Sequence, residues 1–223
     1  MGIKLGLENC EEILSRLGNP QFSFPSIHVA GTNGKGSLCA QLSATSSANG
    51  VKTGLFTSPH LVMVEERIRI DGVPIESHQF DEALRKVMVA SAEDPPISPT
   101  FFETTFLVAM VIFRDFGVQR AVIETGMGGR MDATKLVEAD MSILTTVSFD
   151  HSEYLGNTID AIAREKIAIH RPGNPFIAIK PDELELQRLI EDKAGEDLLW
   201  ATMPTELSMW ESYSAITSMV CDY

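Results

Sequence analysis

A glycine-rich segment near the N-terminus has the residue types that hold phosphate. It runs His-Val-Ala-Gly-Thr-Asn-Gly-Lys-Gly-Ser from position 28 to position 37. Glycines let the backbone approach phosphate oxygens, Lys35 can neutralise β- and γ-phosphate charge, and Ser37 offers a hydroxyl where a helix is expected to start. The candidate ATP-binding residues are therefore the members of this loop: Gly31, Thr32, Asn33, Gly34, Lys35, Gly36 and Ser37.

The segment departs from the usual phosphate-loop pattern at two positions. Position 29 is Val where a Gly belongs, and Gly36 separates Lys35 from Ser37. Taken alone, the segment is therefore also compatible with a glycine-rich turn that is capped by a serine.

Four side chains farther along the chain could complete a site for ATP and a metal. Glu124 ends an apolar run, Ser58 and His151 each follow another such run, and Lys166 lies in a helical pattern. Carboxyl ends of parallel strands face one crevice, and Mg²⁺ prefers oxygen ligands. Each residue also has an ordinary alternative: a solvated strand end for Glu124, a turn serine for Ser58, a histidine that binds no ligand for His151, and a solvated helix residue for Lys166.

Four ordered motifs between positions 5 and 172 resemble the signatures of the folylpolyglutamate synthase and dihydrofolate synthase family, in the Mur ligase superfamily. The first is the Gly-Thr-Asn-Gly-Lys-Gly-Ser loop. The second runs Phe-Thr-Ser-Pro-His-Leu from position 56, with Glu-Arg-Ile-Arg at 66 and Asp-Gly at 71. The third runs Glu-Thr-Gly-Met-Gly-Gly-Arg-Met-Asp-Ala-Thr from position 124, and the fourth comprises Asp-His at 150, Leu-Gly at 155, Thr-Ile at 158 and Arg-Glu-Lys at 164.

The resemblance implies roles that the residues alone leave open. Family residues that match Ser58, Glu124 and His151 hold magnesium, and the lysine that matches Lys166 is carbamylated, which turns a cation into an anion. The implied catalytic residues are Lys35, His151 and Lys166. Three segments align with family segments that contact pteroate, namely Leu5, Gly6, Leu7 and Glu8, then Thr100, Phe101, Phe102 and Glu103, then Met131, Asp132 and Ala133. Phe101 and Phe102 are equally suited to stacking on a pterin and to a core position where a helix begins.

The activity implied by the resemblance is ATP-dependent ligation of L-glutamate to dihydropteroate or to a folate. ATP, as co-substrate with Mg²⁺, would convert the substrate carboxylate to an acyl phosphate, which the amine of glutamate attacks. The motifs do not distinguish the two acceptors. One alternative is an ATP-binding module of the same family that lacks ligase activity. Another is a GTPase-like switch, although the sequence has no Asn-Lys-x-Asp segment to read the base.

Two motif positions and the C-terminus depart from the family pattern. Where the family pattern has Lys-Ala-Gly-Ile, this sequence has Lys-Ile-Ala-Ile from position 166. Where the family pattern has Asp-Ala-Thr-Asn, this sequence has Asp-Ala-Thr-Lys from position 132. Family members also carry a C-terminal ligase domain, for which we find no counterpart before the chain stops at Tyr223. We therefore expect a truncated ATP-binding domain over residues 1–202, an irregular tail over residues 203–223, and weak or no ligation by the chain alone.

The elements that would position these residues alternate along the chain. Short apolar runs predict strands at 26–30, 53–57, 120–124, 141–147 and 176–179. Helical spacing predicts helices at 35–48, 77–92, 104–116, 158–170 and 182–194. Because parallel strands need crossovers, the alternation predicts an α/β, doubly wound, mostly parallel sheet with helices on both faces.

Composition narrows the class of partner. The 223 residues carry a net charge of −13 without a basic cluster, which argues against nucleic acid. No apolar run reaches the roughly 20 residues of a membrane span, and no leader pattern is present. Three cysteines lack metal-ligand spacing and predict free thiols. We expect a cytoplasmic protein, taken as a monomer, with small-molecule partners only.

Overall fold

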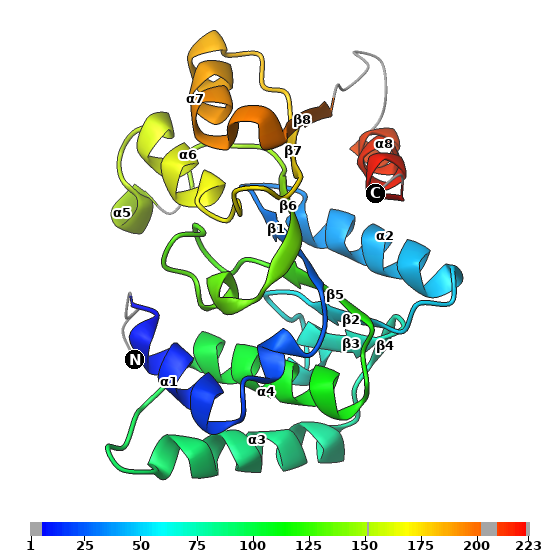
Figure 1. Ribbon diagram of the computed structural model, residues 1–223, viewed down its shortest axis with the longest axis vertical. Coiled ribbons are helices and arrows are strands. Elements are labelled where there is room, and N and C mark those ends of the chain that lie inside the picture. The colour runs from blue at the N-terminus through cyan, green and yellow to red at the C-terminus, as the bar shows by residue number, and fades with distance from the viewer. Residues whose placement is uncertain (1–5, 151, 202–208, 222–223) are drawn as a thin grey trace.

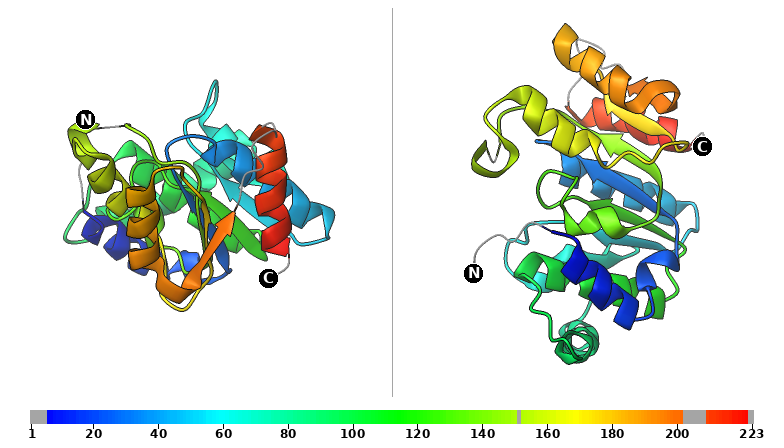
Figure 2. Two further views of the ribbon diagram at one scale, coloured as in Figure 1. Left: turned by 90° about the horizontal axis from the view of Figure 1, so that it is seen from above. Right: turned by 60° about the vertical axis from the view of Figure 1, so that its left-hand side comes forward.

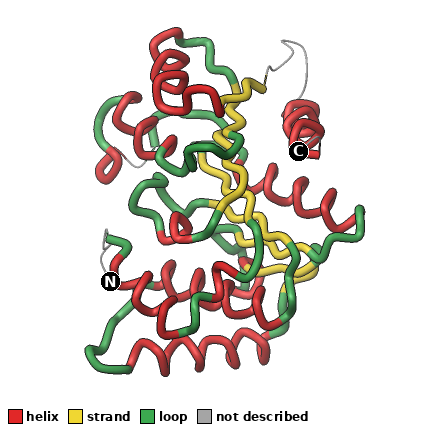
Figure 3. Tube along the Cα trace, viewed as in Figure 1, coloured by secondary structure: helices red, strands yellow, loops and turns green. Residues whose placement is uncertain are grey.

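The computed structural model describes residues 6–150, 152–201 and 209–221, which contain one eight-stranded sheet (Figures 1 and 3). The strand order is β4-β3-β2-β5-β1-β6-β7-β8. The strands are β1 Ser26–Ala30, β2 Thr53–Phe56, β3 Ile68–Ile70, β4 Val73–Pro74, β5 Arg120–Glu124, β6 Ala139–Leu144, β7 Phe176–Ile179 and β8 Leu198–Ala201. In this order, all neighbours from β2 to β8 pair in parallel, and the two pairings at one edge, β2 with β3 and β3 with β4, are antiparallel. The predicted doubly wound, mostly parallel sheet is confirmed.

Helices cover both faces of this sheet. They are α1 Glu8–Arg16, α2 Lys35–Ala48, α3 Ser77–Ala92, α4 Phe101–Asp115, α5 Ser152–Leu155, α6 Ile159–Ile167, α7 Leu184–Ala194 and α8 Met209–Cys221. Short 3-10 turns are η1 Pro20–Phe22, η2 Val64–Arg67, η3 Ala133–Leu136 and η4 Gly195–Asp197. Helices α2 and α8 lie together on one face, whereas α1, α3, α4, α6 and α7 lie on the other (Figures 1 and 2). In the part of the chain that is described, no helix is long and apolar enough to cross a membrane.

Successive side chains of a strand point to opposite faces of the sheet, so each central strand contributes apolar side chains to both helical layers. In β1, Val29 belongs to the apolar cluster under α2 and α8, while Ala30 belongs to the cluster with α6 and α7. In β5, Val122 joins the first of these clusters and Ile123 joins a third cluster under α1, α3 and α4. Central strands that bury both faces read as unbroken apolar runs, which is why they were predictable.

All five predicted strands and all five predicted helices are present, and some of them have shifted ends. Helix α4 begins at Phe101, three residues earlier than predicted, because Thr100 and Glu103 cap its first turn. Helix α6 ends at Ile167, not at 170. Strand β6 ends at Leu144, since residues 145–148 leave the sheet and bond to the loop after β1.

The expected irregular tail is wrong for residues 209–221, which form α8. Tyr213 and Ile216, three residues apart, are buried with α2 in one apolar cluster, and Gln41 Nε2 of α2 donates to Ser214 Oγ at 3.0 Å. Serine and threonine between the apolar positions conceal the helical period in the sequence. Strand β8 was likewise not predicted. Residues 202–208 lie outside the described ranges, and the proposed domain boundary at 202 stays a prediction.

Candidate functional site

The predicted phosphate loop joins the central strand β1 to the N-terminus of α2, at the carboxyl edge of the sheet. Gly34 precedes α2 with a φ of 82°, a left-handed conformation that favours glycine. The loop is bonded to the segment after β6: Thr32 N donates to Thr146 O at 2.7 Å, and Thr145 Oγ1 donates to Asn33 O at 2.8 Å. Amide groups at a helix N-terminus with this bracing form a preorganised anion site.

Gly31 shows how tightly this bracing is packed. Its φ is 148°, and a Cβ at this position would lie 1.8 Å from Thr145 Oγ1. Any side chain would therefore displace Thr145 and the bonds that Thr145 makes to the loop. Asn33 and Ser37 are exposed on the loop surface, and Gly36 is half-buried beside Glu124.

Two predicted lysines meet at one carbonyl oxygen. Lys35 Nζ donates to Gly31 O at 3.0 Å and to Thr32 O at 3.2 Å, and Lys166 Nζ donates to Gly31 O at 3.0 Å. Lys166 is 2% exposed, so the alternative of a solvated helix residue is wrong. Burial, and then the charge of Lys35, lower the pKa of Lys166 to about 8.

Glu124 and Ser58 also meet at this edge of the sheet. Ser58 N donates to Glu124 Oε2 at 3.0 Å, and the carboxylate oxygens lie 3.6 and 3.7 Å from where a Cβ on Gly36 would sit. Glu124 is 4% exposed, which excludes the solvated strand end. Burial raises the pKa of Glu124, while the Ser58 amide and the charge of Lys35 partly oppose the rise.

These groups suit a divalent cation that is also held by phosphate. Within the described ranges, no group of three or more His, Cys, Asp or Glu side chains could hold a metal by itself. Mg²⁺ commonly takes only one or two carboxylates and completes its shell with water and phosphate oxygens. A buried carboxylate beside a phosphate loop fits that requirement. His151, the third predicted ligand, lies outside the described residues.

The predicted substrate segment at the start of α4 divides into an exposed and a structural part. Phe101 is 56% exposed, and the guanidinium of Arg67 lies 5.2 Å from the centre of its ring. Phe102 packs against Phe56 with ring centres 5.8 Å apart. Glu103 is buried and accepts a hydrogen bond from Thr100 N at 2.6 Å, while Glu103 N donates to Thr100 Oγ1. Phe101 is therefore the surface aromatic and Phe102 is partly core.

The other predicted substrate segments converge on the same region. Asp132 is buried, accepts from Met127 N at 2.8 Å and Thr134 N at 3.0 Å, and shapes the turn before η3. Cys10 of α1, Phe106 of α4 and Ala133 of this turn belong to one buried apolar cluster, so the three segments pack together. Glu8 begins α1, Leu7 is its N-cap residue and Gly6 precedes both; Met131 is half-buried and Ala133 is buried in the turn. Leu5 lies outside the described residues.

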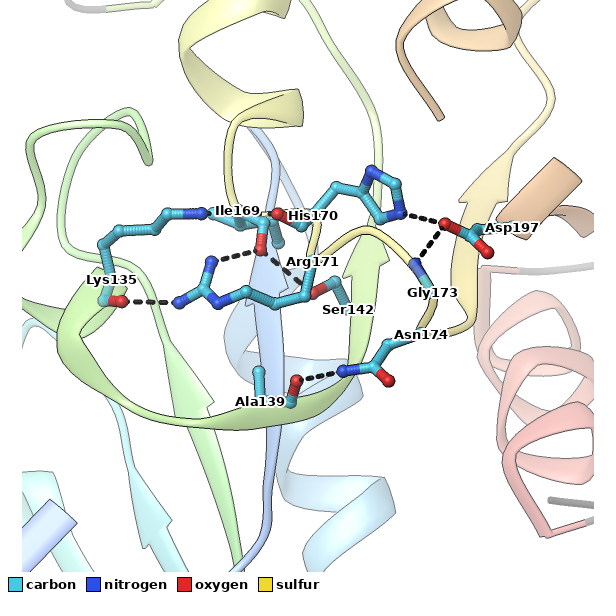
Figure 4. Close-up of polar contacts among 9 residues, drawn as sticks. All are labelled: Lys135, Ala139, Ser142, Ile169, His170, Arg171, Gly173, Asn174 and Asp197. Carbon is cyan, nitrogen blue, oxygen red and sulfur yellow. Dashed lines mark hydrogen bonds and ion pairs between the residues drawn. The ribbon is translucent and has the colours of Figure 1, made fainter. Parts of the chain in front are cut away.

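Lys135, which replaces the family asparagine, ties this turn to the end of α6. Its ammonium group donates to Ala168 O and His170 O, and Arg171 donates back to Lys135 O and to Ile169 O (Figure 4). Burial and the charge of Arg171 lower the pKa of Lys135 to about 8. The lysine thus has a structural role on the helix that carries Lys166.

Several site residues were not predicted from the sequence. Thr145 and Thr146 hold the phosphate loop, and Arg67, whose Nε donates to His60 Nδ1 at 2.8 Å, lies over Phe101. Arg67 and His60 do stand inside the second motif, so that motif was the available signal. Threonines after a strand have no such signal, because their contacts join segments more than a hundred residues apart.

Comparison with known proteins identifies relatives across most of the chain. No family model matches the sequence. A probable dihydrofolate synthetase of Schizosaccharomyces pombe is 37% identical over 197 residues, which make up 88% of this chain and 47% of the relative. The dihydrofolate synthase/folylpolyglutamate synthase of Escherichia coli is 36% identical over 194 residues, 87% of this chain and 44% of the relative.

Solved structures give the same result. E. coli FolC in complex with DHPP and ADP superposes with a TM-score of 0.82 and 33% identity, over 92% of this chain and 49% of that one. The bifunctional enzyme of Yersinia pestis, complexed with AMPPNP and Mn ion, gives a TM-score of 0.87 and 28% identity, over 100% of this chain and 59% of that one. This chain spans about half the length of the curated relatives it matches, and by homology it belongs to the dihydrofolate synthase/folylpolyglutamate synthase family.

Proposed function

We propose that this chain is the ATP-binding part of a ligase that joins L-glutamate to dihydropteroate or to a folate. The observation that carries the proposal is the meeting of Lys35, Lys166 and Glu124 around the phosphate loop at the carboxyl edge of the sheet. Relatives named as dihydrofolate or folylpolyglutamate synthases, and related structures complexed with ADP or AMPPNP, support it. ATP is the proposed co-substrate, and the proposed setting is the cytoplasm.

In the proposed reaction, the γ-phosphoryl group of ATP passes to the substrate carboxylate, which gives an acyl phosphate and releases ADP. The amine of glutamate then attacks the acyl carbon, an amide forms, and phosphate leaves. Lys35 would exchange its two loop carbonyls for phosphate oxygens, and the loop amides would hold the charge as it moves. Ser58 and Glu124, with His151 by resemblance, would hold Mg²⁺, which neutralises phosphate charge when bound.

The acceptor is proposed to lie against the exposed face of Phe101. This ring, with Arg67 above it, starts the helix next to the turn that contains Asp132. A flat pterin could stack there, and a guanidinium could pair with a carboxylate. Because Glu103 and Asp132 each hold backbone amides, their proposed contribution is to fix the shape of this surface.

The first test is nucleotide binding, measured by calorimetry with Mg·ADP. We expect the wild-type chain to bind and the Lys35→Ala variant to lose most of the affinity, because the phosphate charge is then unpaired. Lys193→Ala, which removes a lysine in the last turn of α7, is the matched control and should bind as wild type does. Equal binding by all three proteins would refute a phosphate role for the loop.

The second test separates the ligase from the two alternatives. Phosphate release from ATP is measured with glutamate and either dihydropteroate or tetrahydrofolate, and Lys35→Ala serves as the inactive control. Release that requires an acceptor supports the ligase and identifies the acceptor. Nucleotide binding without such dependence supports a binding module, and a preference for GTP over ATP supports a switch.

A further inference from the structure

Tyr213 of α8 lies against the phosphate loop, at a place that the sequence motifs did not indicate. A Cβ placed on Gly34 would lie 1.5 Å from the Tyr213 hydroxyl oxygen and 2.5 Å from its Cζ, so the hydroxyl occupies the space beside the glycine. The three atoms nearest to that position all belong to Tyr213. Gly34 is thus needed both for its left-handed φ and for this close approach.

Hydroxyl groups lie against the loop at two of its glycines. Thr145, after β6, fills the corresponding space at Gly31, where its Oγ1 would lie 1.8 Å from a Cβ. Tyr213, in α8, fills the corresponding space at Gly34. Tyr213 is 4% exposed and belongs to the apolar cluster between the sheet, α2 and α8. Thr217 Oγ1 donates to the backbone carbonyl oxygen of Tyr213 at 2.8 Å. A buried ring on a packed helix has little freedom to move away.

We propose that Tyr213 is a positioning residue for the nucleotide, because its hydroxyl keeps Gly34 in the conformation that presents the loop amides to phosphate. The inference rests on the proposed nucleotide site and adds a residue from α8 to it. It also gives α8 a role beyond packing: the helix supports the loop at Gly34, while Thr145 supports it at Gly31.

The test compares two variants of α8. Tyr213→Phe removes only the hydroxyl next to Gly34. Ile216→Val removes one methyl group from the same apolar cluster, where Ile216 is fully buried, and leaves the hydroxyl in place. For each protein, Mg·ADP affinity is measured by calorimetry, stability by urea unfolding, and the exchange rates of the Thr32 and Asn33 amides by NMR without nucleotide.

We expect Tyr213→Phe to weaken Mg·ADP binding about five-fold, which equals about 1 kcal/mol, and to speed amide exchange in the loop. Ile216→Val should lower stability and leave both loop measurements unchanged. Wild-type affinity and exchange in the Phe variant would overturn the inference, as would equal loop effects in the two variants, because the helix would then act through stability alone. If the wild-type chain binds no nucleotide, the proposed function fails, and the exchange rates still decide the role of Tyr213.

Discussion

Lys166 and Lys35 donate to the same carbonyl oxygen, that of Gly31, and this shared contact sets the chemistry of the site. Two ammonium groups so placed repel each other, and burial together with this repulsion lowers the pKa of Lys166. A neutral amine can react with CO₂, whereas an ammonium cannot. The lowered pKa of Lys166 is therefore compatible with the carbamate that the family resemblance implies.

We predict that Lys166 forms a carbamate as the pH rises through about 8. NMR with ¹³C-labelled bicarbonate should show a carbamyl signal that grows between about pH 7 and about pH 9, as the uncharged fraction grows. The signal should be absent from Lys166→Arg. Lys135→Arg is the matched control, because the pKa of Lys135 is also lowered to about 8. A signal lost in the Lys135 variant, and kept in the Lys166 variant, would contradict the assignment.

The same lowered pKa makes stability depend on pH. Folding depresses the pKa of Lys166 from 10.5 to about 8, so its contribution is present above about 10.5 and is lost as the pH falls to about 8. Glu124 has the opposite sign: its raised pKa means that its contribution is lost as the pH rises through the folded-state value. At neutral pH Lys166 is held charged against a local cost, as is common where groups serve a ligand.

Glu124→Gln should separate metal binding from folding. The amide keeps an oxygen for the hydrogen bond from Ser58 N but loses the negative charge. We expect the gain in ADP affinity on addition of Mg²⁺ to fall by at least about ten-fold, with no loss of stability at neutral pH, because burial disfavours the charged form of the carboxylate. ADP titrations with and without Mg²⁺ measure this, and Glu82→Gln, an exposed carboxylate on α3, is the control. An undiminished effect of Mg²⁺ in the Glu124 variant would remove this residue from the metal site.

At the scale of elements, the caps of the helices determine where site residues lie. Helix α6 carries Lys166 next to its last residue, and Thr158 Oγ1 accepts a hydrogen bond from Ala161 N at 3.1 Å at its start. We predict that Thr158→Ala lowers the free energy of unfolding by about 1 kcal/mol and that Thr158→Ser restores most of it. Glu183 at the start of α7 makes no side-chain cap, so Glu183→Ala is the matched control in urea unfolding. Equal losses at the two helices would show that the cap is not responsible.

The elements also show what could be predicted from the sequence. Strands β1 and β5 and helices α2 and α3 were predictable to the residue, because buried parallel strands and amphipathic helices have distinct periods. The meeting of Ser58 and Glu124 followed from the rule that carboxyl ends of parallel strands share an edge. Tyr213 and Thr145 could not be predicted, because their importance lies in contacts between distant segments and their residue types are ordinary. Helix α8 was missed since serine and threonine dilute its apolar period.

At the scale of the whole molecule, the excess of acidic residues should control stability. With 31 Asp and Glu against 18 Lys and Arg, the folded chain concentrates a net charge of −13 in a compact volume. Like charges repel more in the folded state than in the expanded one, so the repulsion opposes folding. The charged groups of the candidate site are buried or in direct contact with partners, so salt screens their interactions much less than it screens the net charge.

We therefore predict that salt stabilises this protein. The urea midpoint should rise between about 0.01 M and about 1 M NaCl, over which the Debye length falls from about 30 Å to about 3 Å and the repulsion is screened. At about pH 4.5, where many carboxylates take up protons, the net charge is smaller and the rise should shrink. Urea unfolding followed by circular dichroism at both pH values measures the effect. A midpoint that falls with salt at neutral pH would contradict this prediction. It would mean that surface ion pairs, such as Arg164 with Asp160 at 2.7 Å, stabilise the fold more than the net charge destabilises it.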